Sequence, residues 1–253
     1  MSKFKSLLYR EMVLSKKKTI TQIITVFSII GIGLLCILSM KYGNLNKMYD
    51  EIGAEMNNLI KYTLHYTFVV LPALAFAFSI NDTTFVSSDI RSNWRTFSFT
   101  TPVKPAHKAL VRVVIKLINM LFGGIVITLN SFIMSELNDI KGSTSMILKL
   151  YLIFLAVGQL IECVPCYFKF RARTIKEMYI GDFAGVLIYV LMGVLAYLLC
   201  YEKFSDEEFV PLLLLPKFVD MLDSTWIWAL LVNFVMLFVN YYISCHAMNR
   251  RYD

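Results

Sequence analysis

Six apolar stretches, each roughly twenty residues long, dominate the 253-residue chain and leave no room for a large soluble domain. An apolar helix of about 20 residues is long enough to cross the hydrocarbon core of a bilayer. Backbone polar groups in lipid must be paired within their own segment, so we expect helices. The chain is therefore predicted to be one transmembrane domain, 1–253, of the all-α polytopic class. The predicted spans are residues 19–40, 59–80, 113–134, 147–168, 179–200 and 226–248.

The basic residues predict how these spans are oriented. If the amino terminus lies in the cytoplasm, most of the 25 lysines and arginines fall in segments on the cytoplasmic side. This bias follows the positive-inside rule and favours six spans with both termini cytoplasmic. The formal net charge of +7 then reflects membrane orientation and attraction to anionic lipid. The basic residues are scattered over separate loops, and no nucleic-acid partner is expected.

The chain offers few groups for chemistry of its own. Its three histidines lie on three different segments, and the sequence contains no phosphate-binding loop of the G-x-x-x-x-G-K-[ST] type. Cys163 and Cys166 have the spacing of a redox motif, but they lie in an apolar span beside Glu162, where a thiolate is disfavoured. The five cysteines all fall in or at the ends of spans and predict no disulfide framework. We therefore expect no enzyme, no bound cofactor and no metal site.

The first eighteen residues are predicted to form an amphipathic helix along the cytoplasmic face. Phe4, Leu7, Leu8 and Met12 form an apolar stripe at helical spacing, and basic residues surround it. The apolar run that follows is too long for the core of an ordinary signal peptide, and no small-x-small cleavage site comes after it. We therefore expect the first span to be retained.

The most informative polar segment is the predicted cytoplasmic loop 81–112. Ser87 or Ser88 can cap a short helix whose first turn carries Asp89, a favourable charge at the positive end of a helix dipole. Proline residues then end the segment before the third span. The helix would present an aromatic stripe with two arginines on an adjacent face. The residues that we assign to this surface are Asp89, Ile90, Arg91, Trp94, Arg95 and Phe97.

Two interpretations of this loop helix follow from its residues. It can lie on lipid headgroups as an interfacial helix. It can also be a docking surface for a cytoplasmic subunit, because Trp and Arg are frequent anchors of protein interfaces.

The order of residues in this loop is similar to one known family. An acid, a spacer, Trp94 and Phe97 are followed by Thr101-Pro102-Val103 and a basic stretch that leads into the third span. This order, together with the amphipathic amino terminus, resembles the ABC type-2 exporter permeases. The resemblance covers the whole chain in topology and only a short segment in motif. The chain departs from the commoner pattern because Asp89 stands alone where many relatives carry several acids, and because Arg95 follows the tryptophan where an acid is frequent.

The resemblance implies a function for the chain and a set of partners. It implies a permease subunit that forms a dimer, a homodimer rather than a heterodimer. The dimer would bind two copies of a separate ATP-binding subunit. That subunit would hold ATP and Mg²⁺, and the loop helix 88–99 would be the coupling element seated in its cleft. Members of this kind sit in the bacterial cytoplasmic membrane and export peptides, toxins or antibiotic-like amphipathic molecules. The competing interpretation is an accessory or immunity membrane protein that needs no ATPase.

The predicted outer loop 201–225 contains an apolar run that is too short to cross a membrane. Pro211 and Pro216 bound this run, and Leu213 lies between them. We expect a re-entrant turn, and the family resemblance implies that these residues gate the exit. The alternative is a loop that lies on the outer leaflet.

Glu162 is the acidic residue that lies deepest inside a predicted span, whereas Asp182 lies at the cytoplasmic start of the fifth span. Glu162 stands about 9 Å from the cytoplasmic end of its span at 1.5 Å per residue, so it should face protein or water. It can line a transport cavity that binds a cationic cargo. It can instead hold helices together by hydrogen bonds, with Asn119 or Asn240 as partner. Lys116 and Lys149 are expected to extend toward the nearer interface without a special role.

Overall fold

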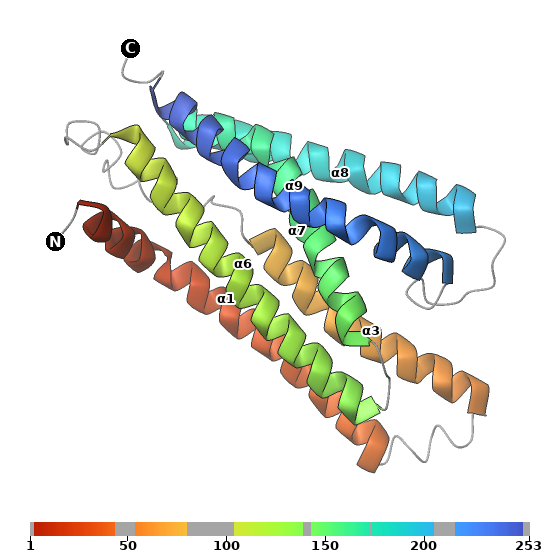
Figure 1. Cartoon of the computed structure of the whole chain (residues 1–253). Coiled ribbons are helices and arrows are strands. Elements are labelled where there is room, and N and C mark those ends of the chain that lie inside the picture. The colour runs from red at the N-terminus through yellow and green to blue at the C-terminus, as the bar shows by residue number, and fades with distance from the viewer. Residues whose placement is uncertain are drawn as a thin grey trace.

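A computed structural model describes residues 3–43, 54–79, 104–138, 143–172, 174–204 and 216–249. Within these ranges the chain is all-helical. The helices, labelled as in Figure 1, are α1 (Lys3–Tyr42), α3 (Ala54–Ser79), α6 (Pro105–Asn138), α7 (Ser143–Arg171), α8 (Ile175–Phe204) and α9 (Pro216–Asn249).

Five of these helices are long and apolar enough to cross a membrane, so the predicted multi-pass helical class is confirmed. The predicted span 179–200 falls within α8, which is not one of the five. Six spans and cytoplasmic termini therefore remain predictions. The five segments that meet these requirements of length and apolar composition are Thr19–Tyr42, Ile60–Ala77, Pro105–Leu137, Thr144–Phe168 and Val219–Met248.

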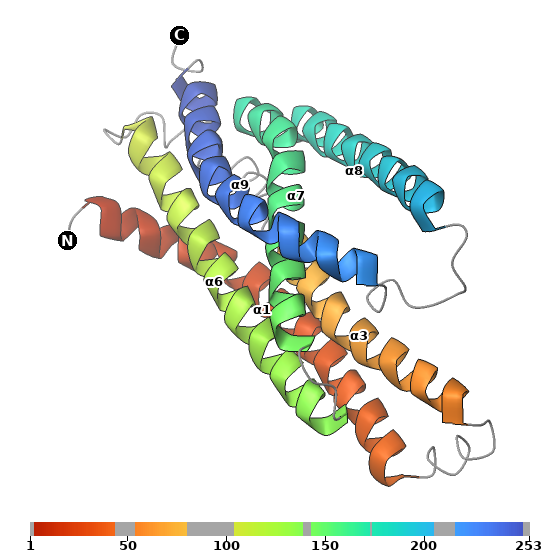
Figure 2. The same ribbon diagram turned by 45° about the vertical axis from the view of Figure 1, so that its right-hand side comes forward.

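Several helices extend beyond the predicted spans. Helix α1 is continuous from the predicted amphipathic segment into the first span, and Figure 2 shows its first turns running at an angle to the remainder. Helix α6 begins at Pro105. Proline suits the first helical position, because an N–H at that position has no intrahelical partner and its absence costs no hydrogen bond. Helix α9 begins at Pro216, so 216–225 of the predicted outer loop is helical.

Helix α7 lies at the centre of the bundle. It packs against α3, α6, α8 and α9, whereas α1 packs against α3 and α6 on one side (Figures 1 and 2). Helix α8 approaches α7 closely near Gly185, where an added Cβ would lie 2.9 Å from Cγ of Pro165. The start of α1 and the end of α9 lie at the same end of the bundle in both views.

The main hydrophobic core lies where α1, α3, α6 and α7 meet. Its buried residues include Val69, Ile127 and Tyr151. The outward faces carry large apolar side chains, among them Phe183 on α8 and Phe238 on α9, which are exposed. In a protein that crosses a membrane, such side chains face lipid and not water.

Candidate functional site: a polar seam between helices α6, α7 and α9

Lys116 and Glu162 form a buried ion pair inside the bundle. Lys116 lies on α6 and Glu162 on α7, and the Lys116 ammonium donates to Oε2 of the glutamate. Both side chains are about 5% exposed. The expected partner of Glu162 was Asn119 or Asn240, and the expectation that Lys116 extends toward an interface is wrong. Glu162 is paired with a cation of the same chain, so neither buried charge is left without a counter-charge.

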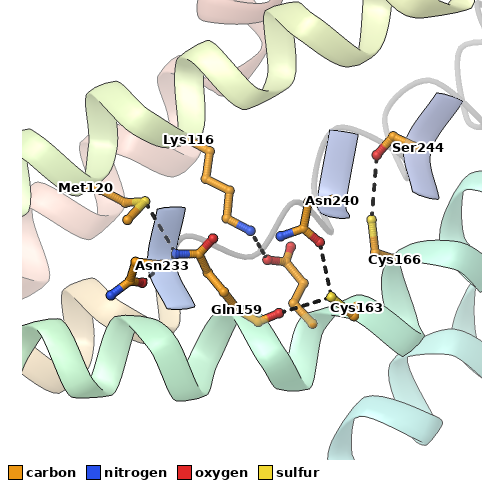
Figure 3. A network of polar contacts seen from close by, with 9 residues as sticks. Lys116, Met120, Gln159, Cys163, Cys166, Asn233, Asn240 and Ser244 are labelled. Atoms are coloured by element: carbon orange, nitrogen blue, oxygen red, sulfur yellow. Dashed lines mark hydrogen bonds and ion pairs between the residues drawn. The ribbon is translucent and has the colours of Figure 1, made fainter. Parts of the chain in front are cut away.

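This ion pair belongs to a larger set of polar groups that we call the polar seam. On α7 the seam residues follow i, i+3, i+4 and i+7 spacing, so they share one helix face. On α9 the seam residues are also spaced by whole turns and face α7 (Figure 3). The seam consists of Lys116, Gln159, Glu162, Cys163, Cys166, Asn233, Asn240 and Ser244.

Asn233 is the most fully bonded amide of the seam. Its Nδ2 donates to the backbone carbonyl of Leu152 at 2.8 Å and to that of Ala229 at 2.9 Å. Its Oδ1 accepts a hydrogen bond of 2.6 Å from Nε2 of Gln159. The hydrophobic effect does not drive helices together within a membrane, because lipid tails are as apolar as the side chains. Close packing and interhelical hydrogen bonds of this kind contribute to helix pairing instead. Asn233 therefore ties α9 to α7 at two points.

The two cysteines of the C-x-x-C motif both face α9. The Cys163 thiol lies 3.5 Å from Oδ1 of Asn240, and the Cys166 thiol lies 3.8 Å from the Ser244 hydroxyl. The interpretation of these cysteines as packing residues agrees with this geometry. The described residues contain no group of three His, Cys, Asp or Glu side chains that could hold a metal ion.

Two amide atoms of the seam keep unused hydrogen-bonding capacity. Oε1 of Gln159, an acceptor, and Nδ2 of Asn240, a donor, are buried and have no hydrogen-bond partner among the described residues. An unsatisfied polar group in a low-dielectric interior is costly, and it favours any polar ligand that reaches it.

A second ion pair joins α7 and α9 at the opposite end of α7. Nζ of Lys149 lies 2.6 Å from Oδ1 of Asp223, and the aspartate is more than half exposed. Lys149 therefore also has a partner that the sequence did not reveal. Exposed ion pairs of this kind contribute about 0–1 kcal/mol to stability, so we expect its loss to be tolerated better than the loss of one partner of the buried pair.

Apart from Pro216, the other predicted site residues lie outside the described residues. The loop surface comprising Asp89, Ile90, Arg91, Trp94, Arg95 and Phe97 falls there, and so do Pro211 and Leu213 of the predicted outer gate. Pro216 is the first residue of α9.

Sequence reasoning found Glu162 but missed the seam around it. Gln159, Cys163 and Cys166 repeat at helical spacing with Glu162, and that spacing was a usable signal for a polar face. Asn233 and Asn240 are seven residues apart in the last span and gave the same signal. Comparison of the chain with protein-family models, with curated proteins and with solved structures finds no match.

Proposed function

We propose that this chain is the membrane-spanning permease subunit of an ATP-driven ABC exporter. The observation that carries the proposal is the Lys116–Glu162 pair, buried between α6 and α7 within two membrane-spanning segments. Ionisable residues inside membrane segments are costly and rare, and they often belong to the path of a substrate or an ion. Glu162 is then a point in the pathway of a positively charged, amphipathic cargo.

The ATP-driven part of the proposal rests on the sequence resemblance around Trp94. The loop helix 88–99 would dock into a separate ATP-binding subunit, which holds ATP and Mg²⁺. Two permease copies and two ATP-binding subunits would form the exporter in a bacterial cytoplasmic membrane. ATP-driven closure of the ATPase pair would rock the permease helices and open the outward path.

The loop surface provides the test. The chain is co-expressed with a stand-alone ATP-binding protein that carries a phosphate-binding loop, sought among the products of the neighbouring genes, and is purified through a tag on this chain. We expect Trp94→Ala to abolish co-purification of that subunit while membrane insertion is unchanged, because a central tryptophan anchor commonly contributes 2 kcal/mol or more to an interface, roughly a thirtyfold change in affinity. Trp228→Ala is the matched control, since Trp228 is exposed on the outer face of α9.

Charge reversal adds a second measurement on the same surface. Arg91→Glu and Arg95→Glu should weaken the complex in a salt-dependent way if acidic groups of the ATPase meet them. Normal co-purification and normal transport with Trp94→Ala would show that the loop helix does not dock the ATPase and lies on lipid headgroups instead. A chain that binds no ATPase at all would be the ATPase-independent accessory or immunity protein instead.

A further inference from the structure

An apolar groove runs between α6 and α7 on the outside of the bundle. Its volume is about 470 Å³. The two polar side chains in its wall, Thr128 and Tyr151, are bonded to the backbone of α6, with the threonine hydroxyl on the Gly124 carbonyl and the tyrosine hydroxyl on the Met120 carbonyl. The groove therefore offers a ligand an almost wholly apolar surface. Its apolar lining includes Leu121, Ile125, Leu129, Leu148, Leu152 and Leu155.

The groove leads into the polar seam. Thr128, Gly124, Met120 and Lys116 recur every fourth residue, so they lie along one stripe of α6. Twelve residues of helix separate the two ends of this stripe, which is about 18 Å at 1.5 Å per residue. Met120 joins the two regions, because it lines the groove and its sulfur accepts from Nε2 of Gln159 at 3.7 Å. One turn beyond Met120 is the ion pair.

The seam end of this stripe is suited to an ammonium group. An ammonium has three donors and no acceptor, so it needs acceptors around it. The Glu162 carboxylate is buried there and already holds the ammonium of Lys116. Gln159 is 2% exposed, and its Oε1 has no hydrogen-bond partner among the described residues. That oxygen is a second acceptor on the same face of α7, one helical turn before Glu162.

We propose that the groove and the ion pair together form a binding site for a single-chain amphiphile with a primary ammonium head. Its alkyl chain lies along the groove, and its ammonium replaces that of Lys116 at Glu162 and donates to Gln159. The displaced Lys116 side chain carries its charge toward the nearer interface on its four-carbon stem. The groove faces the lipid side, so the ligand enters sideways from the bilayer. This inference rests on the proposed function and specifies the class of its cargo.

The test is photolabelling of the purified full chain in nanodiscs of zwitterionic lipid, without an ATPase. The probe is hexadecylamine with a diazirine in its chain, and the matched control probe is the corresponding alcohol. Mass spectrometry reads the labelled residues. We expect the amine to label the groove segments 120–129 and 148–155 about tenfold more than the alcohol, a preference of about 1.4 kcal/mol.

Two variants separate the head-group contact from the groove. The double variant Lys116→Met/Glu162→Gln removes both charges without leaving one unpaired, so amine labelling should fall to the level of the alcohol. Gly124→Leu should reduce labelling by both probes, because the leucine side chain would fill the groove. The substitution fits without a clash, since an added Cβ meets only Cε1 of Tyr151, at 3.6 Å. Glu136→Gln, at an exposed acid of α6, is the control and should change neither.

Equal labelling of the groove by amine and alcohol in the unaltered chain would overturn the proposal. A persisting amine preference in Lys116→Met/Glu162→Gln would overturn it as well. No ATP-binding subunit is present in this assay, so its result is independent of the co-purification test. If the chain binds an ATPase but shows no preference for the amine probe, the proposed function would stand and the proposed cargo class would be wrong.

Discussion

At the scale of single residues, the Lys116–Glu162 pair makes the sharpest prediction about stability. Removing one partner of a buried pair leaves an uncompensated charge and typically costs about 3–5 kcal/mol, whereas replacing both partners by neutral groups is often nearly neutral. We therefore expect Glu162→Ala to lower the free energy of unfolding by about 3 kcal/mol. Reversible unfolding in mixed detergent micelles measures this change.

Lys116→Met/Glu162→Gln is the control for that measurement and should lie within about 1 kcal/mol of the unaltered chain. Equal losses in the single and double variants would show that packing, and not charge, determines the stability of this site. The sequence indicated that Glu162 must face protein or water, because that follows from the cost of a charge in lipid. It did not indicate the partner, because a lysine near a span end is equally compatible with an interfacial position.

At the scale of helices, the contact between α6 and α7 depends on one of two neighbouring glycines. A Cβ added at Gly123 would lie 2.5 Å from the Tyr151 hydroxyl, whereas one added at Gly124 has ordinary contact distance. Gly123→Leu should push Tyr151 away and break its 2.9 Å bond to the Met120 carbonyl. We expect Gly123→Leu to lower the melting temperature in detergent by several degrees, and Gly124→Leu to leave it nearly unchanged.

Similar shifts for both glycine variants would contradict this account of the contact. The helices themselves were predictable from the sequence, because a continuous apolar run in lipid has no other way to pair its backbone. Their ends were less predictable. Residues 216–225 and 105–112 continue the spans as helix, since hydropathy identifies only the part of a helix that lies in hydrocarbon. Which helices pack together depends on fine features such as Gly123, which the apolar pattern does not contain.

At the scale of the whole molecule, α8 determines the topology. With 30 residues it is about 45 Å long, enough to cross a bilayer, although it packs against the bundle mainly through α7. The start of α1 and the end of α9 lie at one end of the bundle, an arrangement that an even number of crossings produces. The positive-inside bias predicts that this end lies in the cytoplasm.

Reporter fusions test this topology at three positions. A reporter that is active only in the cytoplasm should work when fused after residue 173 and after residue 253, and it should fail when fused after residue 210. The expectation follows from the predicted six-span topology, in which α8 and α9 each cross the membrane once and the segment that joins them lies outside. Equal reporter activity at 173 and 210 would mean that α8 does not cross. The carboxyl terminus would then lie outside, and the assignment of the loop 81–112 and both ends of the chain to one compartment would fail with it.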